Sequence, residues 1–148
     1  MKRSEVRGPM RLLGVDPGER RIGLAVSDPE GKVATPVGVI DRDDVEDAAG
    51  AVVARARELG AEGIVVGMPI TLRGEVGPAA RQVQEFVEEL RAAGELPVTV
   101  CDERLTTAVA ERAMLEADLS RRARREKVDK VAATLILQAY LDRHPTSD

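Results

Sequence analysis

The spacing of apolar residues changes once along this chain, and that change restricts its fold more than any other feature. Up to residue 40, apolar side chains alternate with polar ones or form short runs, which is typical of β-strands joined by tight turns. From residue 45 onward, longer stretches with helical spacing separate short, wholly apolar segments. The predicted strands cover residues 11–16, 21–28, 33–40, 63–67 and 97–101. The predicted helices cover residues 45–59, 78–94, 106–116 and 127–141.

Three strands joined by short turns and followed by a β/α alternation predict an α/β fold, with one mixed five-stranded sheet flanked by helices on both faces. Pro36 lacks a backbone N–H, so the third strand is expected at a sheet edge. The wholly apolar fourth strand is expected in the centre of the sheet, and the fifth is expected to be buried as well. A chain of 148 residues is expected to form a single domain.

Local signals predict where the helices begin and end. Asp43 or Asp44 is expected to cap the first helix, and Gly60 is expected to end it. Pro78 suits the first turn of the second helix. The apolar stripe of the last helix is predicted to consist of Val128, Val131, Ala132, Leu135, Ile136 and Ala139.

The two ends of the chain differ in composition from the rest. Residues 1–9 are charged and lack the apolar stretch of a secretory signal, so we expect a disordered extension there, or a native start at Met10. The domain is expected over residues 10–142, followed by a polar tail at 143–148. A single cysteine, Cys101, and the absence of a signal or a long apolar run favour a cytoplasmic protein without a membrane span.

Histidine and cysteine are scarce, because the chain contains only His144 and Cys101. This excludes a disulfide framework and metal sites built from several histidine or cysteine ligands, so any metal must bind to oxygen. The two aromatic residues, Phe86 and Tyr140, are too few for a base-stacking platform. Neither a Walker A pattern nor a GxGxxG pattern is present, so nucleotide-binding loops of those types are not supported.

Carboxylates directly follow two of the predicted strands: Asp16 follows the first, and Asp102 and Glu103 follow the last. If these strands run parallel with the fourth between them, the carboxylates emerge at one sheet edge, where open α/β sheets place their sites. Asp129, in the first turn of the last helix and at the flank of its stripe, can face that edge. Each of these residues alone also fits an ordinary turn, cap or surface position.

Converging carboxylates without histidine or cysteine suit Mg²⁺ or Mn²⁺, which prefer oxygen ligands and retain water molecules for a phosphate-bearing substrate. Two such ions about 3.5–4 Å apart can clamp a phosphodiester, one activating water and the other stabilising the leaving oxygen. The sequence therefore allows a two-metal site at the predicted sheet edge.

A basic stretch surrounds Asp129. From Ser120 to Lys130 there are six basic and two acidic side chains, a net +4, which leaves −8 for the rest of a chain whose total is −4. The acidic average therefore does not exclude a nucleic-acid partner. We interpret the stretch as a flexible basic lip that contacts phosphates, and a solvated surface is the alternative.

Four blocks of the sequence occur in a fixed order: LLGVDPGERRIGLAVSD at 12–28, IVVGMP at 64–69, VCDERLTT at 100–107 and VDKVAATLILQAYL at 128–141. Together these blocks resemble the YqgF/RuvX family, the Holliday-junction-resolvase-like proteins of the RNase H superfamily. The resemblance extends from residue 11 to about residue 142. It implies an RNase H-like fold and a catalytic, metal-binding set of Asp16, Glu103 and Asp129, in which Glu103 is favoured over Asp102.

The same resemblance implies a metal-dependent endonuclease that matures the 5′ end of precursor small-subunit ribosomal RNA. A Holliday-junction resolvase that acts on four-way DNA junctions is the alternative, and a non-catalytic RNA- or transcription-complex-binding factor is a third hypothesis. We expect Mg²⁺ or Mn²⁺ as cofactor, with two ions when substrate is bound, and a monomer or homodimer. The expected substrate-binding residues are Arg104, Arg121, Arg122, Arg124, Arg125 and Lys127.

Overall fold

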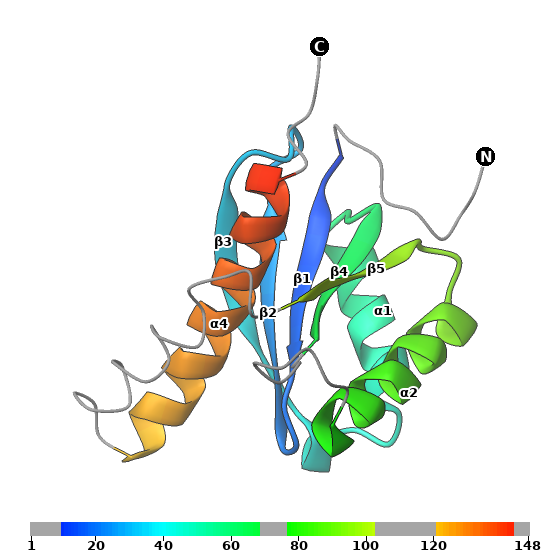
Figure 1. The fold of residues 1–148 in the computed structure, drawn as a ribbon, viewed down its shortest axis with the longest axis vertical. Helices are drawn as coiled ribbons and strands as arrows, with labels where there is room; N and C mark the ends of the chain where they lie inside the picture. Colours follow the sequence, from blue (N-terminus) through cyan, green and yellow to red (C-terminus); the bar gives the residue numbers. More distant parts are fainter. Residues whose placement is uncertain (1–9, 69–76, 103–120, 144–148) are drawn as a thin grey trace.

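A computed structural model describes residues 10–68, 77–102 and 121–143 of the chain (Figure 1). The strands are β1 (Leu12–Pro17), β2 (Arg21–Ser27), β3 (Ala34–Asp41), β4 (Gly63–Met68) and β5 (Val98–Asp102). The helices are α1 (Ala48–Glu58), α2 (Pro78–Ala93), α4 (Arg121–Arg143) and the short 3₁₀ helix η1 (Arg42–Asp44). The helix predicted at 106–116 lies outside the described residues. Within the described part of the chain, no helix is both long and apolar enough to cross a membrane.

The five described strands form one mixed sheet, as the sequence predicts, and their order is β3-β2-β1-β4-β5 (Figure 1). β1 to β3 pair as an antiparallel meander, with Leu13 opposite Val26 and Leu24 opposite Gly38. β4 pairs in parallel with both β1 and β5. The first and last strands are therefore parallel with the fourth between them, which is the condition for strand-end carboxylates to emerge at one edge.

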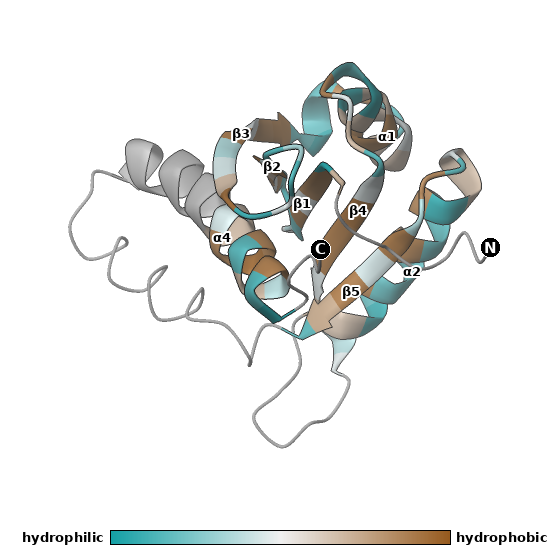
Figure 2. Ribbon diagram, turned by 90° about the horizontal axis from the view of Figure 1, so that it is seen from above, coloured by the Kyte–Doolittle hydropathy of each residue, from teal (hydrophilic) through white to brown (hydrophobic). Residues whose placement is uncertain are grey.

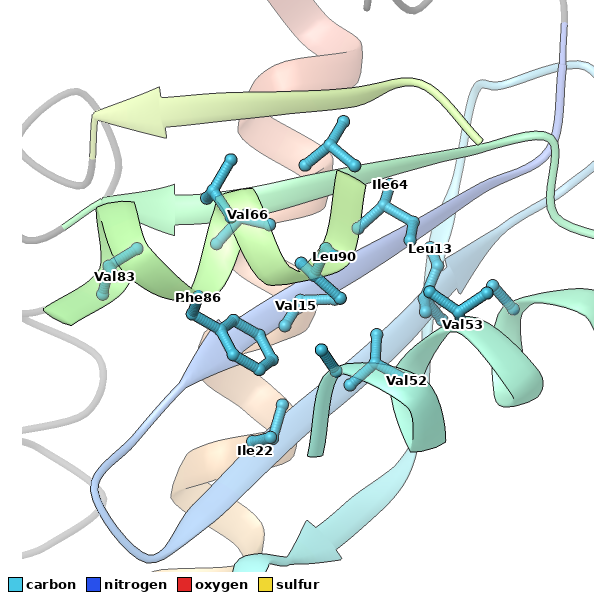
Figure 3. Packing of buried hydrophobic residues seen from close by; sticks show 14 of the residues in the cluster. Leu13, Val15, Ile22, Val52, Val53, Ile64, Val66, Val83, Phe86 and Leu90 are labelled. Atoms are coloured by element: carbon cyan, nitrogen blue, oxygen red, sulfur yellow. The ribbon is translucent and has the colours of Figure 1, made fainter. Parts of the chain in front are cut away.

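Side chains alternate between the two faces of the sheet and divide the core into two clusters. On one face, Leu13 and Val15 of β1 pack with Val66 of β4 against α1 and α2 (Figure 3). On the other face, Leu12 of β1 and Val65 of β4 pack against α4. Viewed from above, the sheet lies between α4 on one side and the α1–α2 pair on the other (Figure 2). The described residues thus form a three-layer sandwich with the sheet in its middle.

The two edge strands differ from each other in how well they were predicted. β3 is an edge strand, as Pro36 indicates, and its register shifts between Leu24 and Ala25 of β2, next to that proline. β5 is the other edge and not the buried strand that was expected. Although Val98 and Cys101 are buried, Val100 is 45% exposed, because β5 pairs only with β4 among the described strands.

The start of α1 corrects one prediction. Asp47 is its N-cap, accepting a hydrogen bond from the backbone N–H of Gly50 at 3.1 Å, so neither Asp43 nor Asp44 is the cap. Those two residues belong to η1, which Asp41 caps by accepting from the N–H of Asp43. The preceding 3₁₀ turn delays the helix by several residues, and local spacing alone did not indicate that turn.

The other helix ends agree with the sequence. Gly60 follows the end of α1 with φ +73°, the left-handed conformation in which glycine carries no Cβ penalty. Pro78 is in the first turn of α2, and Gly94 follows its last residue. These signals are local, because they depend only on the conformations that proline and glycine favour.

The last helix is longer than predicted, and its packed face matches the predicted stripe only in part: Ala132 and Ile136 are buried as predicted, and the side chains of Val128 and Val131 are not described. Leu135 and Ala139 are only half-buried, whereas the fully packed positions are Ala132, Ala133, Ile136, Leu137, Tyr140 and Leu141. The reason is a close approach to β1: a Cβ added at Gly14 would lie 2.7 Å from Leu137 Cβ and 3.1 Å from the Ala133 carbonyl oxygen. The helix therefore turns the face containing Ala133 and Leu137 toward the sheet.

Candidate functional site

Asp16 is a buried carboxylate near the carboxyl end of β1. Its exposed fraction is 7%, and Asp16 and Ser27 are the buried polar or charged residues of the described chain. By strand alternation Asp16 shares the face of Leu12 and Gly14, which is the face that α4 covers. Removing a carboxylate from water is costly unless other groups compensate for it. A carboxylate held at this position is therefore a candidate for a function beyond folding.

The positions beside Asp16 in the sheet are glycines. Gly23 of β2 is its antiparallel partner. On the other side lies β4, in which Val66 is the register partner of Val15. The next residue of β4, Gly67, therefore lies beside Asp16, and it pairs with Cys101 of β5 on its far side. Neither lateral neighbour has a side chain that competes for the space beside the carboxylate. It is the strand register that places these glycines on either side of Asp16.

Helix α4 runs antiparallel to β1, so that its earlier turns lie toward the end of the strand that carries Asp16 (Figure 1). Leu12 packs in the same cluster as Leu141, while Gly14 meets Ala133 and Leu137. Residue 129 precedes Ala133 by one helical turn, so it shares the helix face that meets β1. Position 129 is therefore in line with the residues of α4 that meet β1. From the sequence it was expected at the flank of the apolar stripe.

The last residue of β5 lies on the opposite face. Asp102 pairs with Met68 of β4 and alternates with Cys101, which packs on the α4 face. By parity Asp102 belongs with Val98 to the face of α1 and α2. Of the two adjacent strand-end carboxylates, Asp102 is thus the one that does not share a face with Asp16.

Several predicted site residues are only partly described or not described. Glu103 and Arg104 lie outside the described residues. The stretch from residue 121 to 130 forms the first turns of α4, so the helix begins before residue 127, where it was predicted to start. The structure describes the helical backbone of Arg121, Arg122, Arg124, Arg125, Lys127 and Asp129, but not their side chains. Within the described residues, no group of three or more His, Cys, Asp or Glu side chains is arranged to hold a metal ion.

Two polar contacts anchor α4 over the sheet. At the β3 edge, the Gln138 amide accepts from the N–H of Ala34 and donates to the carbonyl of Lys32, both at 2.9 Å. At the β5 edge, Tyr140 and Thr99 share a side-chain hydrogen bond. Burial raises the pKa of the Tyr140 phenol above its ordinary value, the Thr99 hydrogen bond lowers that pKa, and nearby Cys101 raises it. The helix is therefore held at both edges of the face that contains Asp16.

Comparison with known proteins gives one family and one type of fold. The model of a family described as "RuvX: Holliday junction resolvase" matches residues 10–143. A Clostridium perfringens protein named "Putative pre-16S rRNA nuclease" is 48% identical over 134 residues, 90% of this chain and 98% of the relative. A Desulforudis audaxviator protein of the same name is 45% identical over 133 residues, 90% of this chain and 94% of the relative.

Among solved structures, Thermus thermophilus RuvC in complex with a Holliday junction substrate aligns with a TM-score of 0.53 at 19% identity, covering 94% of this chain and 99% of RuvC. The fowlpox virus Holliday junction resolvase also aligns with a TM-score of 0.53, at 12% identity, over 90% of this chain and 99% of the viral protein. At these identities the likeness concerns the fold alone, and it confirms the expected RNase H-like architecture.

Proposed function

This chain belongs to the RuvX family, and from that premise we propose that it is a nuclease that hydrolyses phosphodiester bonds with the aid of divalent cations. Its proposed substrate is precursor 16S ribosomal RNA, with cleavage at the 5′ end of the mature sequence. Relatives that are 45% and 48% identical over nearly their whole length are named as nucleases of that precursor, which supports this substrate.

The observation that carries the proposal is the placement of Asp16, buried at the end of a central strand and facing α4 between two glycine positions. We assign Glu103 and Asp129 as its partners. The alternation of side chains along β5 supports Glu103, because its neighbour Asp102 belongs to the face opposite Asp16. The helical spacing from Ala133 supports Asp129.

A set of carboxylates suits Mg²⁺ or Mn²⁺, and Asp16 fits such a site because it offers oxygen donors beside positions without side chains. When bound, two divalent cations supply an activated water and stabilise charge on the leaving oxygen. The role of the chain is to hold the carboxylates in place and to position the substrate. For positioning, we propose that the arginines and lysine at the start of α4, together with Arg104, contact substrate phosphates.

Cleavage of a four-way DNA junction is the second candidate activity. The description of the family model and the RuvC-like fold favour it. The two activities make different demands on assembly, because symmetric nicking of a junction requires two active sites related by two-fold symmetry. A homodimer that makes paired nicks would support the resolvase, and a monomer that cuts only RNA would support the ribosomal function.

The substitution Asp16→Asn tests the catalytic assignment. It keeps the size of the side chain but removes its negative charge, so we expect the rate of RNA cleavage to fall roughly a hundredfold or more. Asp102→Asn is the matched control, since it makes the same change at a strand end on the opposite face, and we expect it to retain most of the activity. Both proteins are assayed with Mg²⁺ or Mn²⁺ on a precursor ribosomal RNA leader and on a four-way DNA junction.

Binding of each nucleic acid is measured in parallel to separate catalysis from recognition. We expect Asp16→Asn to bind the preferred substrate without cutting it. Equal cleavage by the wild-type protein and Asp16→Asn would contradict the assignment of Asp16. Cleavage of the junction alone would contradict the ribosomal substrate but not the metal-dependent chemistry.

A further inference from the structure

The turn that follows Asp16 is held from outside the β1–β2 hairpin by one arginine. Arg42, the first residue of η1, donates its backbone N–H to the carbonyl of Arg20 at 2.8 Å. Its side-chain Nε donates to the carbonyl of Gly18 at 2.9 Å. Both acceptors lie in the hairpin loop that begins two residues after Asp16.

The Gly18 backbone is therefore restrained on both sides. Its N–H donates to the Arg21 carbonyl at 2.9 Å within the hairpin, and its own carbonyl accepts from Arg42. A Cβ added at Gly18 would lie 2.6 Å from the Arg21 carbonyl oxygen, so the turn is too tight for any other residue without a shift. The conformation of the chain immediately after Asp16 thus depends on a long-range contact.

The guanidinium of Arg42 also lies 5.1 Å from the centre of the Phe86 ring. Phe86 is buried in α2, where it packs among the residues between the sheet and the two helices (Figure 3). A planar guanidinium can stack on a ring while its N–H groups donate in the plane, which a lysine ammonium cannot do. Arg42 consequently links the hairpin to a helix of the rigid core.

We propose that Arg42 is a positioning residue for the Asp16 carboxylate. This inference rests on the proposed function, in which Asp16 binds a divalent cation. Metal ligands must be held within about half an ångström of their working positions, and a hairpin loop is the part of a strand pair with the fewest restraints. By tying Gly18 to α2, Arg42 restricts the motion of the strand end that bears Asp16, without contacting the substrate or the cation itself.

The test compares Arg42→Met with Arg91→Met. Methionine keeps an unbranched apolar side chain but removes both the donor to Gly18 and the guanidinium that lies over the Phe86 ring. Arg91 is a matched control, because it donates to the carbonyl of Val98 at 3.0 Å and links α2 to β5, away from the hairpin. Arg42→Lys restores a positive charge and a donor, but not the stacking plane, so it should recover part of what Arg42→Met loses.

The first measurement needs neither metal nor substrate. In Arg42→Met we expect faster hydrogen exchange at the Gly18 amide than in the wild-type protein, and no such change in Arg91→Met. The second measurement is the Mn²⁺ concentration that gives half of the maximal rise in unfolding temperature. It should increase several-fold in Arg42→Met and remain unchanged in Arg91→Met.

In steady-state cleavage, we expect kcat of Arg42→Met to fall about tenfold while KM for the RNA stays near the wild-type value, because the defect lies in ligand geometry. Arg42→Lys should give intermediate values of both kcat and the Mn²⁺ midpoint. Wild-type values of kcat and of the Mn²⁺ midpoint in Arg42→Met would overturn the positioning role, even if Gly18 exchanges faster. A wild-type protein that neither binds Mn²⁺ nor cleaves would instead overturn the proposed function itself.

Discussion

At the scale of single residues, the face of β1 beneath α4 is notable for how little side-chain volume it carries. Gly14 allows the helix to approach until Leu137 Cβ is 2.7 Å from where a Cβ would lie, and Asp16 follows two positions later on the same face. Gly23 and Gly67 occupy the positions on either side of Asp16. None of these three glycines has a positive φ, so backbone conformation does not require glycine at these positions, whereas the close approach of α4 requires it at Gly14.

The substitution Gly14→Ala tests this packing. The added methyl group must displace Leu137 and the backbone at Ala133, so we expect a loss of about 1–3 kcal/mol in the free energy of unfolding. Gly38→Ala in β3 is the control, because a Cβ there meets no atom within 4 Å, and we expect it to be neutral or slightly stabilising. Urea unfolding of both variants measures the difference, and equal stabilities would contradict the close approach of α4.

At the scale of elements, α4 determines what the candidate site can be. It covers the face that holds Asp16, it brings residue 129 toward the same end of β1, and its contacts at Gln138 and Tyr140 reach both sheet edges. The approach to Gly14 selects the helix face that meets the sheet. A change in the docking of α4 therefore changes the site as a whole.

Tyr140 reports that docking, because it is the single tyrosine of a chain without tryptophan. Burial raises its pKa, so the folded protein should lose the phenol proton at a higher pH than the unfolded chain, whose ordinary value is 10.0. The stability that depends on the neutral phenol is present below pH 10 and is lost as the pH rises through the folded-state pKa. Tyrosinate absorbance, measured in native buffer and in denaturant, gives the two midpoints.

Thr99→Val is the companion variant for this titration. The Thr99 hydrogen bond lowers the pKa of Tyr140, so its removal should raise the native midpoint further and leave the denatured midpoint unchanged. A native midpoint equal to that of the denatured chain would mean that Tyr140 is not buried between α4 and the sheet.

Helix ends show which element-level features the sequence can specify. Gly60 and Pro78 were identified correctly, because their backbone preferences act at the residue itself. The cap of α1 was misplaced, because an unforeseen 3₁₀ turn comes first and Asp47 is the aspartate whose carboxylate reaches the N–H of Gly50. A run of several aspartates offers more caps than a helix can use, and the path of the chain selects among them.

At the scale of the whole molecule, charge is distributed unevenly. The net charge is −4, yet α4 begins with Arg121 and Arg122 and carries most of the basic stretch in its first turns. That end of α4 lies toward the carboxyl end of β1 (Figure 1). Because phosphates are attracted to a local surface and not to a net charge, an acidic protein of this kind can bind nucleic acid at one end.

This distribution predicts how binding depends on salt. Replacing Arg121, Arg122, Arg124 and Arg125 by alanine should weaken RNA binding and make the slope of log K against log salt shallower by roughly three, if each arginine neutralises one phosphate. Arg57→Ala with Arg81→Ala, two exposed arginines on α1 and α2, is the control and should leave the slope unchanged. An unchanged slope in the fourfold variant would mean that these arginines form a solvated surface and do not contact phosphates.

The sequence by itself determined the strands, the mixed sheet, the Pro36 edge and the convergence of the ends of β1 and β5. These features follow from periodicity and turn chemistry, which act between residues close together in the chain. The tertiary structure decided which face of α4 meets the sheet, that β5 is an edge, and that Asp16 and Asp102 lie on opposite faces. Those outcomes depend on the packing of elements far apart in sequence. At Gly14, for example, the lack of a Cβ is what allows α4 to approach β1.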